Sequence, residues 1–124
     1  MKHKRKNPEL KLHIDIKNLL LTVLPKEAAD TLIHVPMGGK RSRETGALMK
    51  YMGARPGVGD FNFVYSGGLY EIEVKPEGEK QTAVQKAREA AIIAAGGLYA
   101  VCRSQDDVRE TLALWCVPSR EVAK

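Results

Sequence analysis

Apolar side chains recur at helical spacing in several segments of the chain, and these segments are predicted to be helices. The clearest one spans residues 8–24 and is ended by Pro25. Its apolar face consists of Leu12, Ile16, Leu19, Leu20 and Val23. Further helices are predicted over residues 26–30, 44–52 and 82–95, and from a capping Ser104 to before Pro118.

Strand composition marks two neighbouring segments, residues 60–65 and 69–75, which are separated by a Gly-Gly pair at 67–68. Gly-Gly is a favoured two-residue hairpin turn because both positions tolerate positive φ. A turn at this pair places Asp60 opposite Lys75. The two segments are therefore predicted to form a β-hairpin.

Side chains alternate along a strand, so this hairpin has two faces of different character. The apolar face consists of Phe61, Phe63, Tyr65, Tyr70, Ile72 and Val74. The polar face consists of Asp60, Asn62, Glu71, Glu73 and Lys75. Shorter strands are predicted at residues 31–35 and 98–102. The order helix, strand, hairpin, helix, strand, helix predicts an α/β sandwich whose mixed sheet has a central hairpin flanked by helices.

The length of 124 residues fits one compact domain. We expect a basic flexible tail at residues 1–7, a single domain at 8–118 and a C-terminal tail at 119–124. No apolar run approaches the ~20 residues needed to cross a bilayer, and no apolar segment follows the basic start as in a signal peptide. Cys102 and Cys116 belong to no metal-binding motif, so we expect buried or half-buried free thiols in a reducing cytoplasm.

Basic residues are in moderate excess, with 20 Lys and Arg against 15 Asp and Glu. They gather at the start of the chain and again between residues 40 and 55. We expect contacts to a phosphate backbone from the second group, namely Lys40, Arg41, Arg43 and Arg55. An ordinary solvated surface is the alternative.

Asp60 and the later Glu73-Val74-Lys75 fit the pattern D…ExK. Cleavage of a phosphodiester needs a nucleophilic water and relief of the charge that builds up on the phosphorus centre. Mg²⁺ takes oxygen ligands, and the two carboxylates with the Val74 backbone carbonyl are suitable donors. Lys75 could orient or deprotonate the water, or offset developing charge. The ExK pattern alone is also typical of a solvated sheet face.

Three consecutive stretches resemble the VRR-NUC domain family, a branch of the PD-(D/E)xK nucleases. They are HVPMGGKR at 34–41, MGARPGVGDF at 52–61 and LYEIEVK at 69–75, followed by QTAVQ at 81–85 and GLYAVCRS at 97–104. The resemblance covers nearly the whole chain in the family's order and is to the stand-alone form found in phages. It implies a restriction-endonuclease-like core.

The resemblance also implies roles for individual residues. Asp60 and Glu73 match the metal-binding carboxylates, Lys75 the catalytic lysine and Gln85 a glutamine that completes the site. Glu9 matches an acidic residue of the first helix that approaches the metal. Gln85 is equally suited to be the capping-box partner of a threonine three residues earlier, and the two roles can coexist.

Two positions depart from the family pattern. The family commonly has Pro before the aspartate, where this chain has Gly59, and Asn after the histidine-containing strand, where it has Met37. His34 could contact DNA or act as a general base, although a lone histidine near a strand end is more often structural. Glu71 is interpreted as a surface or supporting residue.

The resemblance and the residues together predict an endonuclease that uses Mg²⁺, with Mn²⁺ able to substitute, to hydrolyse DNA. Stand-alone family members resemble Holliday junction resolvases and act as homodimers, so we expect branched duplex DNA as substrate and a homodimer. A phage-encoded protein would act in the host cytoplasm. The alternatives are a non-catalytic nucleic-acid-binding module and a sequence-specific restriction-type endonuclease.

Overall fold

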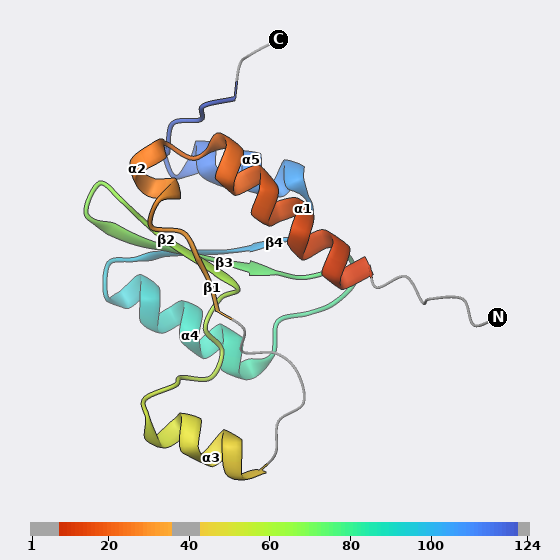
Figure 1. Cartoon of the computed structure of the whole chain (residues 1–124), viewed down its shortest axis with the longest axis vertical. Helices are drawn as coiled ribbons and strands as arrows, with labels where there is room; N and C mark the ends of the chain where they lie inside the picture. The colour runs from red at the N-terminus through yellow and green to blue at the C-terminus, as the bar shows by residue number, and fades with distance from the viewer. Residues whose placement is uncertain (1–7, 36–42, 122–124) are drawn as a thin grey trace, which may run out of the picture.

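The computed structural model describes residues 8–35 and 43–121 and consists of a four-stranded sheet with helices on both faces (Figure 1). The elements are α1 (Pro8–Val23), α2 (Lys26–Ala29), β1 (Ile33–His34), α3 (Arg43–Tyr51), β2 (Phe61–Tyr65), β3 (Gly68–Val74), α4 (Ala83–Ala94), β4 (Leu98–Cys102) and α5 (Gln105–Leu114). Strands β1, β2 and β3 are antiparallel neighbours, and β4 runs parallel to β3. The predicted mixed sheet with a central hairpin is confirmed.

Element ends differ only slightly from the predicted ones, except that β1 is much shorter than the segment 31–35. The predicted tail at 1–7 and the loop that holds Met37 lie outside the described residues, as do residues 122–124. Within the described part of the chain, no helix has both the length and the apolar character that a membrane crossing requires.

The hairpin turn lies one residue earlier than predicted. Tyr65 pairs with Gly68, so the two turn residues are Ser66 and Gly67. Their φ angles of 49° and 80° fit a type I′ turn, whose twist matches that of the flanking strands. A serine therefore accepts the left-handed conformation that the sequence analysis assigned to a second glycine.

Packing across the hairpin accounts for this register. Phe63 pairs with Tyr70, and their rings stack with centroids 5.0 Å apart and planes 3° from parallel. The predicted turn would have placed Phe63 opposite Ile72 instead. The stacked cross-strand aromatic pair offsets the modest strain of Ser66.

The shift changes the partners of the hairpin residues but not their faces. Phe61 pairs with Ile72, so Asp60 lies at the register position of Glu73, and the predicted pairing of Asp60 with Lys75 is wrong. Because each partner moves by two positions, every side chain stays on its predicted side of the sheet. The separation into an apolar and a polar face is confirmed.

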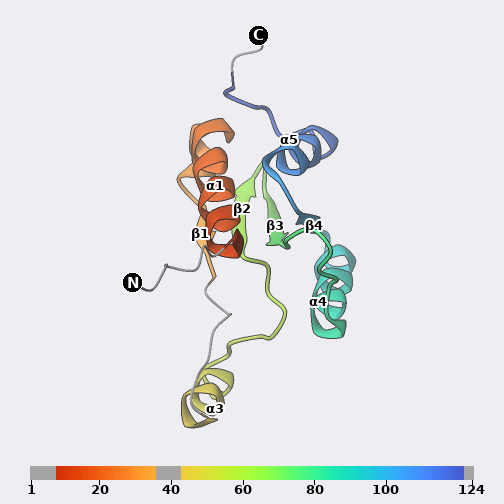
Figure 2. The same cartoon turned by 90° about the vertical axis from the view of Figure 1, so that its right-hand side faces the viewer.

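The core lies between the apolar sheet face and the helices α1 and α5. Its buried members include Ile16, Leu20, Phe61, Phe63, Ile72, Val74, Val108 and Leu112. Helix α4 covers the other face, opposite α1, as Figure 2 shows. The polar face of the hairpin is thus buried under α4 rather than open to solvent.

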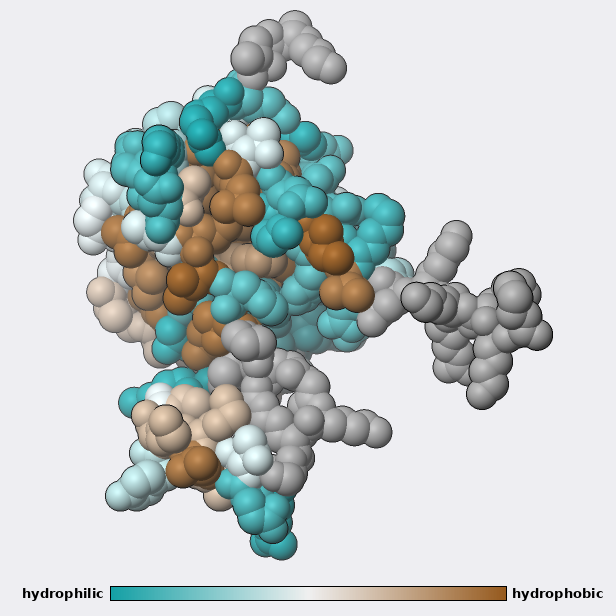
Figure 3. Space-filling model, viewed as in Figure 1, coloured by the Kyte–Doolittle hydropathy of each residue, from teal (hydrophilic) through white to brown (hydrophobic). Residues whose placement is uncertain are grey.

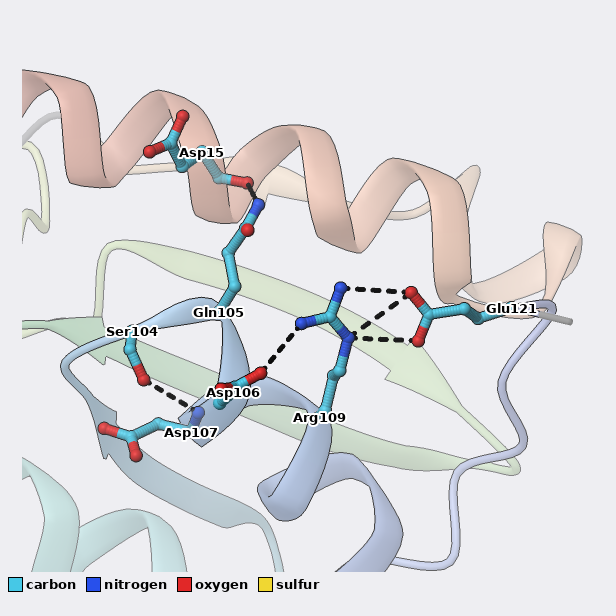
Figure 4. Close-up of polar contacts among 7 residues, drawn as sticks. All are labelled: Asp15, Ser104, Gln105, Asp106, Asp107, Arg109 and Glu121. Carbon is cyan, nitrogen blue, oxygen red and sulfur yellow. Dashed lines mark hydrogen bonds and ion pairs between the residues drawn. The ribbon is translucent and has the colours of Figure 1, made fainter. Parts of the chain in front are cut away.

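Polar contacts attach α5 to α1 and to the chain beyond it (Figure 4). The Ser104 side chain caps the helix, as predicted, and the Gln105 amide donates to the Asp15 carbonyl of α1 at 2.9 Å. The Arg109 guanidinium forms an ion pair with Glu121 at 3.0 Å. These contacts join α5 to α1 and to the segment that follows α5.

Helix α3 protrudes from the rest of the molecule (Figures 1 and 2). None of its residues is buried, and Tyr51 is 90% exposed at its C-terminal end. Figure 3 shows hydrophobic residues on this projecting part, where Leu48 and Met52 are also exposed. The helix contributes nothing to the main core.

The two cysteines differ in their surroundings. Cys102 is buried at the end of β4, and burial raises the pKa of its thiol to about 11. Cys116 is exposed, so the prediction that both thiols are at least half-buried is wrong for it. It follows the C-cap Trp115 in a left-handed conformation with φ 59°, where the chain turns away from α5.

Candidate active site

The carboxylates of the D…ExK pattern meet where β2 begins and β3 ends. Asp60 directly precedes β2, and its Oδ2 accepts the backbone N–H of Val74 at 2.7 Å. Together with Glu73 it lines a pocket of about 230 Å³. The other predicted site residues on its wall are Glu9, Val74, Lys75 and Gln85. Residues from α1, the hairpin and α4 are thus brought to one hollow.

Glu73 is deeply placed in this pocket. It is 5% exposed, and its Oε1 accepts a hydrogen bond from the Gln85 amide at 2.7 Å. Its Oε2 is buried without a hydrogen-bond partner among the described residues. Burial, followed by the negative charge of Asp60, raises the pKa of this carboxyl to about 8, and the Lys75 ammonium only partly opposes the rise.

Gln85 has both of the contacts expected for its two roles. Its Oε1 accepts the backbone N–H of Thr82 at 2.9 Å, while the Thr82 hydroxyl accepts the Gln85 N–H at 3.2 Å. The predicted capping box is therefore present. The amide nitrogen of the same side chain remains free to reach Glu73, so the cap fixes the orientation of a residue that touches the site.

Glu71 supports the site from beneath α4. It is 1% exposed and forms an ion pair with Arg88 of α4 at 2.5 Å. Its Oε2 also accepts the backbone N–H of Gly59 at 3.1 Å. Because Gly59 directly precedes Asp60, the buried carboxylate of Glu71 ties down the segment that presents the Asp60 side chain.

The contact with Glu71 gives a physical reason why this chain has Gly59 where the family commonly has proline. Proline has no N–H to donate, so the residue common in the family could not make this hydrogen bond. A Cβ at Gly59 would lie 3.2 Å from the Ile72 carbonyl oxygen and 3.3 Å from the Glu71 side chain. The approach of this segment to β3 is therefore close.

Gly57 fits the same segment against α4. Its φ is +79°, and a Cβ there would lie 2.6 Å from the Val84 carbonyl oxygen. Any side chain would push the segment away from the first turn of α4. Glycine at this position keeps the wall of the pocket closed on the side of Thr82 and Gln85.

Lys75 and Glu9 approach the pocket from different elements. Lys75 follows β3, is 9% exposed and donates its backbone N–H to the Cys102 carbonyl at 3.1 Å. Glu9 lies in the exposed first turn of α1. The structure thus places an ammonium and a third carboxylate on the walls around Asp60 and Glu73.

His13 and Arg88 are site-forming residues that the sequence analysis missed. The His13 Nε2 lies 3.6 Å from the Asp60 Oδ1. His13 is one helical turn after Glu9, so the i, i+4 spacing from a predicted site residue was an available signal. Arg88 is three residues after Gln85 on α4, and the i, i+3 spacing was a similar signal.

The predicted DNA contacts are only partly described. Lys40 and Arg41 lie outside the described residues. Arg43 begins α3 and Arg55 follows it, and both side chains are exposed. Neither lines the pocket of the carboxylates. They lie on or beside the protruding helix instead.

The sheet order, the flanking helices and the carboxylate pair on the hairpin define a restriction-endonuclease-like fold. A solved structure described as a VRR_NUC domain protein matches this chain with a TM-score of 0.72 and 21% sequence identity, over 90% of each chain. The chain therefore has the fold of a VRR_NUC domain, as the sequence analysis expected. No family model matches the sequence, and the comparison with curated proteins found no match.

A divalent cation fits the donors of this pocket. The oxygens of Asp60, Glu73 and Glu9 are hard ligands of the kind that Mg²⁺ prefers. The unpartnered Oε2 of Glu73 and the raised pKa of its carboxyl both indicate that positive charge is lacking beside it. A cation would stabilise the ionised form of both adjacent carboxylates.

Proposed function

We propose that this protein is a metal-dependent DNA endonuclease that hydrolyses phosphodiester bonds. The observation that carries the proposal is the convergence of Asp60, Glu73 and Lys75 on one pocket of a nuclease-type fold. The buried Oε2 of Glu73, which has no hydrogen-bond partner among the described residues, supports it, since a cation would stabilise the ionised form of this carboxyl. The activity itself follows from this chemistry and from the resemblance of the motifs.

Asp60 and Glu73 would hold Mg²⁺, with the Val74 backbone carbonyl and Glu9 as further donors and Mn²⁺ as a substitute. When bound, such an ion acidifies a coordinated water and polarises a phosphoryl oxygen. Gln85 keeps the Glu73 carboxylate in place through its 2.7 Å hydrogen bond. Glu71 does the same for the Asp60 segment through Gly59.

Lys75 would act on the reacting groups directly. Its side chain shares the pocket with the two carboxylates and is largely shielded from solvent. An ammonium in that position stabilises negative charge that develops on a phosphate more strongly than it would in water. It can also orient the attacking water by donating a hydrogen bond to it.

DNA is the proposed polymer because the chain carries a net charge of +5 and basic residues near the protruding helix. Lys40, Arg41, Arg43 and Arg55 would contact phosphates, which fixes position but reads no base sequence. Branched duplex DNA and a homodimer are part of the proposal. A homodimer would present two sites, as cleavage of both strands at a junction requires.

The proposal is tested by incubating the purified protein with labelled four-way junction, linear duplex and single-stranded DNA in Mg²⁺, Mn²⁺ or EDTA. Metal-dependent cleavage of the junction is expected to fall at least a hundredfold in Lys75→Ala. Lys26→Ala is the matched control, since Lys26 is an exposed lysine of α2 paired only with a neighbour on the surface. Cleavage by this control should equal that of the wild type.

The remaining outcomes separate the alternatives. Retained DNA binding without cleavage of any substrate, unchanged in Asp60→Ala, would replace the proposal with a non-catalytic binding module. Cleavage of linear duplexes at defined sequences, with no preference for junctions, would indicate a restriction-type endonuclease. Sedimentation of the protein with and without junction DNA tests the homodimer independently of cleavage.

A further inference from the structure

Three side chains that can bind metals meet at Asp60. They are His13 of α1, His34 of β1 and Asp60 itself. Each offers one ligand atom, and these atoms all lie within 4.8 Å of one another. The His13 Nε2 and the Asp60 Oδ1 are 3.6 Å apart. Two adjacent tetrahedral ligands of Zn²⁺, each about 2.0–2.1 Å from the ion, are separated by roughly 3.4 Å.

From this geometry we propose that His13, His34 and Asp60 form a second cation site, which binds a transition-metal dication of the Zn²⁺ type. Two imidazoles and one carboxylate are the ligand set that zinc accepts when a fourth position is left for water or substrate. Mg²⁺ prefers oxygen ligands alone, so this site and the oxygen-lined pocket select different ions.

The two sites share the Asp60 carboxylate, whose two oxygens have different neighbours. The Asp60 Oδ2 faces β3, where it accepts the Val74 N–H. The Oδ1 faces His13. Glu73 lines the first pocket and is not one of the three residues of this group. A metal held by the histidines therefore needs no ligand from Glu73.

The rings around the site limit the motion of the imidazoles. His34 packs on Phe61 with centroids 5.2 Å apart, and the two imidazoles meet edge to face at 5.7 Å. Such contacts hold the ring nitrogens near the carboxylate before any ion arrives. Ring packing is also the competing explanation, because an aromatic cluster could exist for stability alone.

A phenylalanine in place of His34 distinguishes the two explanations. His34→Phe keeps an aromatic ring beside Phe61 but removes the ligand nitrogen. His34 is exposed, so this substitution leaves the core unchanged. If folding nevertheless fails, His34→Asn removes the imidazole with a small polar side chain.

The experiment is a titration of untagged protein with Co²⁺, which replaces Zn²⁺ and reports its ligands by visible absorption. In the presence of excess Mg²⁺, the wild type is expected to develop the absorption of a low-coordinate Co²⁺ ion. The affinity should fall at least tenfold in His34→Phe and in His13→Phe. Glu73→Gln should still bind Co²⁺, because Glu73 is not one of the three ligands. The tenfold loss corresponds to about 1.4 kcal/mol.

Two control variants exclude other ligands of the chain. His3→Ala tests the third histidine of the sequence, and Cys116→Ser tests the exposed thiol. Both should bind Co²⁺ as the wild type does. Unchanged affinity in His34→Phe would overturn the proposal. Loss of binding in Glu73→Gln as well would also overturn it, by showing one shared site. The readout is metal binding, so it is independent of whether the protein cleaves DNA.

Discussion

The two faces of the β2–β3 hairpin are both buried, but they bury opposite kinds of side chain. On one face Phe63 and Ile72 pack against α1 and α5. On the other, Glu71 and Glu73 lie under α4, 1% and 5% exposed. Ordinary hairpins of this type leave the polar face in water. This protein covers it, although burial of a carboxylate is costly.

Glu71 and Glu73 are both buried on the polar face, but their hydrogen-bond partners give them different roles. Glu71 is fully partnered, by Arg88 and by the Gly59 N–H, and therefore supports the structure. Glu73 has one oxygen bound to Gln85 and one without a hydrogen-bond partner in the described part of the chain. Of two neighbouring buried carboxylates, the incompletely satisfied one is the candidate for chemistry.

The largest effect on stability is expected on the apolar face. Phe63→Ala removes a ring that is 1% exposed and stacked on Tyr70. The cavity should lower the free energy of unfolding by about 3–5 kcal/mol, measured by urea denaturation. Val64→Ala on the same strand is the control, since Val64 is 46% exposed, and should change it by less than about 0.5 kcal/mol. Similar losses for both would contradict the assigned face of the hairpin.

A smaller but still large loss of stability is expected when the ion pair on the polar face is broken. Arg88→Ala leaves the buried Glu71 carboxylate without its cation, which should cost on the order of 2–3 kcal/mol of unfolding free energy. Arg109→Ala breaks exposed ion pairs and should lower the unfolding free energy far less than Arg88→Ala does.

A second substitution sharpens the test of this buried ion pair. Adding Glu71→Gln to Arg88→Ala should restore part of the lost stability, because a neutral amide needs no counter-ion. Failure to restore any would mean that Arg88 acts through packing alone. A double-mutant cycle in urea measures this coupling.

A still smaller difference is expected at Gly59. Gly59→Pro removes the N–H that Glu71 accepts, whereas Gly59→Ala keeps it and adds the same Cβ. The proline variant should be less stable than the alanine variant by on the order of 1 kcal/mol, measured by thermal unfolding. Equal stability would show that the close approach to β3, and not the hydrogen bond, excludes proline here.

The last effect, that of Glu73→Gln in the metal-free protein, depends on pH and is smallest below about pH 4. With a pKa of about 8, the carboxyl is mostly protonated at pH 7 and resembles an amide. Because the folded-state pKa lies above the unfolded value, this group contributes full stability below about pH 4. That contribution is lost progressively between about pH 4 and pH 8, because the unfolded chain releases this proton before the folded chain does. The variant should therefore exceed the wild type in stability at pH 9.

Divalent metal should make the wild type more stable than Glu73→Gln at pH 9. If the pocket holds Mg²⁺ as proposed, the ion should stabilise the ionised carboxylate of the wild type by mass action, whereas the amide variant should gain little. Melting curves at pH 9 with Mg²⁺ or EDTA measure both effects. Glu77→Gln, at an exposed position of the following loop, is the control and should show neither. An unchanged pH profile in Glu73→Gln would contradict the raised pKa.

Local patterns were enough to predict the elements and the faces of the hairpin. Alternation along a strand is a property of the backbone itself, so Glu73 and Lys75 share a face whatever the register. The cap at Thr82 was equally readable, because its partner is three residues away. The register of the hairpin could not be read in this way, because Ser66 accepts a positive φ only when packing elsewhere offsets the strain.

The sequence by itself indicated which residues could carry the chemistry, namely Asp60, Glu73 and Lys75, because their types and spacing follow from short-range rules; the site role of Gln85 came from the resemblance of the motifs. Only the tertiary structure decided their surroundings. The approach of His13 and His34 to Asp60 depends on how α1 and β1 pack on the hairpin. Burial of Glu71 and Glu73 depends on α4 crossing that face. Desolvation and charge proximity arise from contacts between distant segments, and no local pattern encodes them.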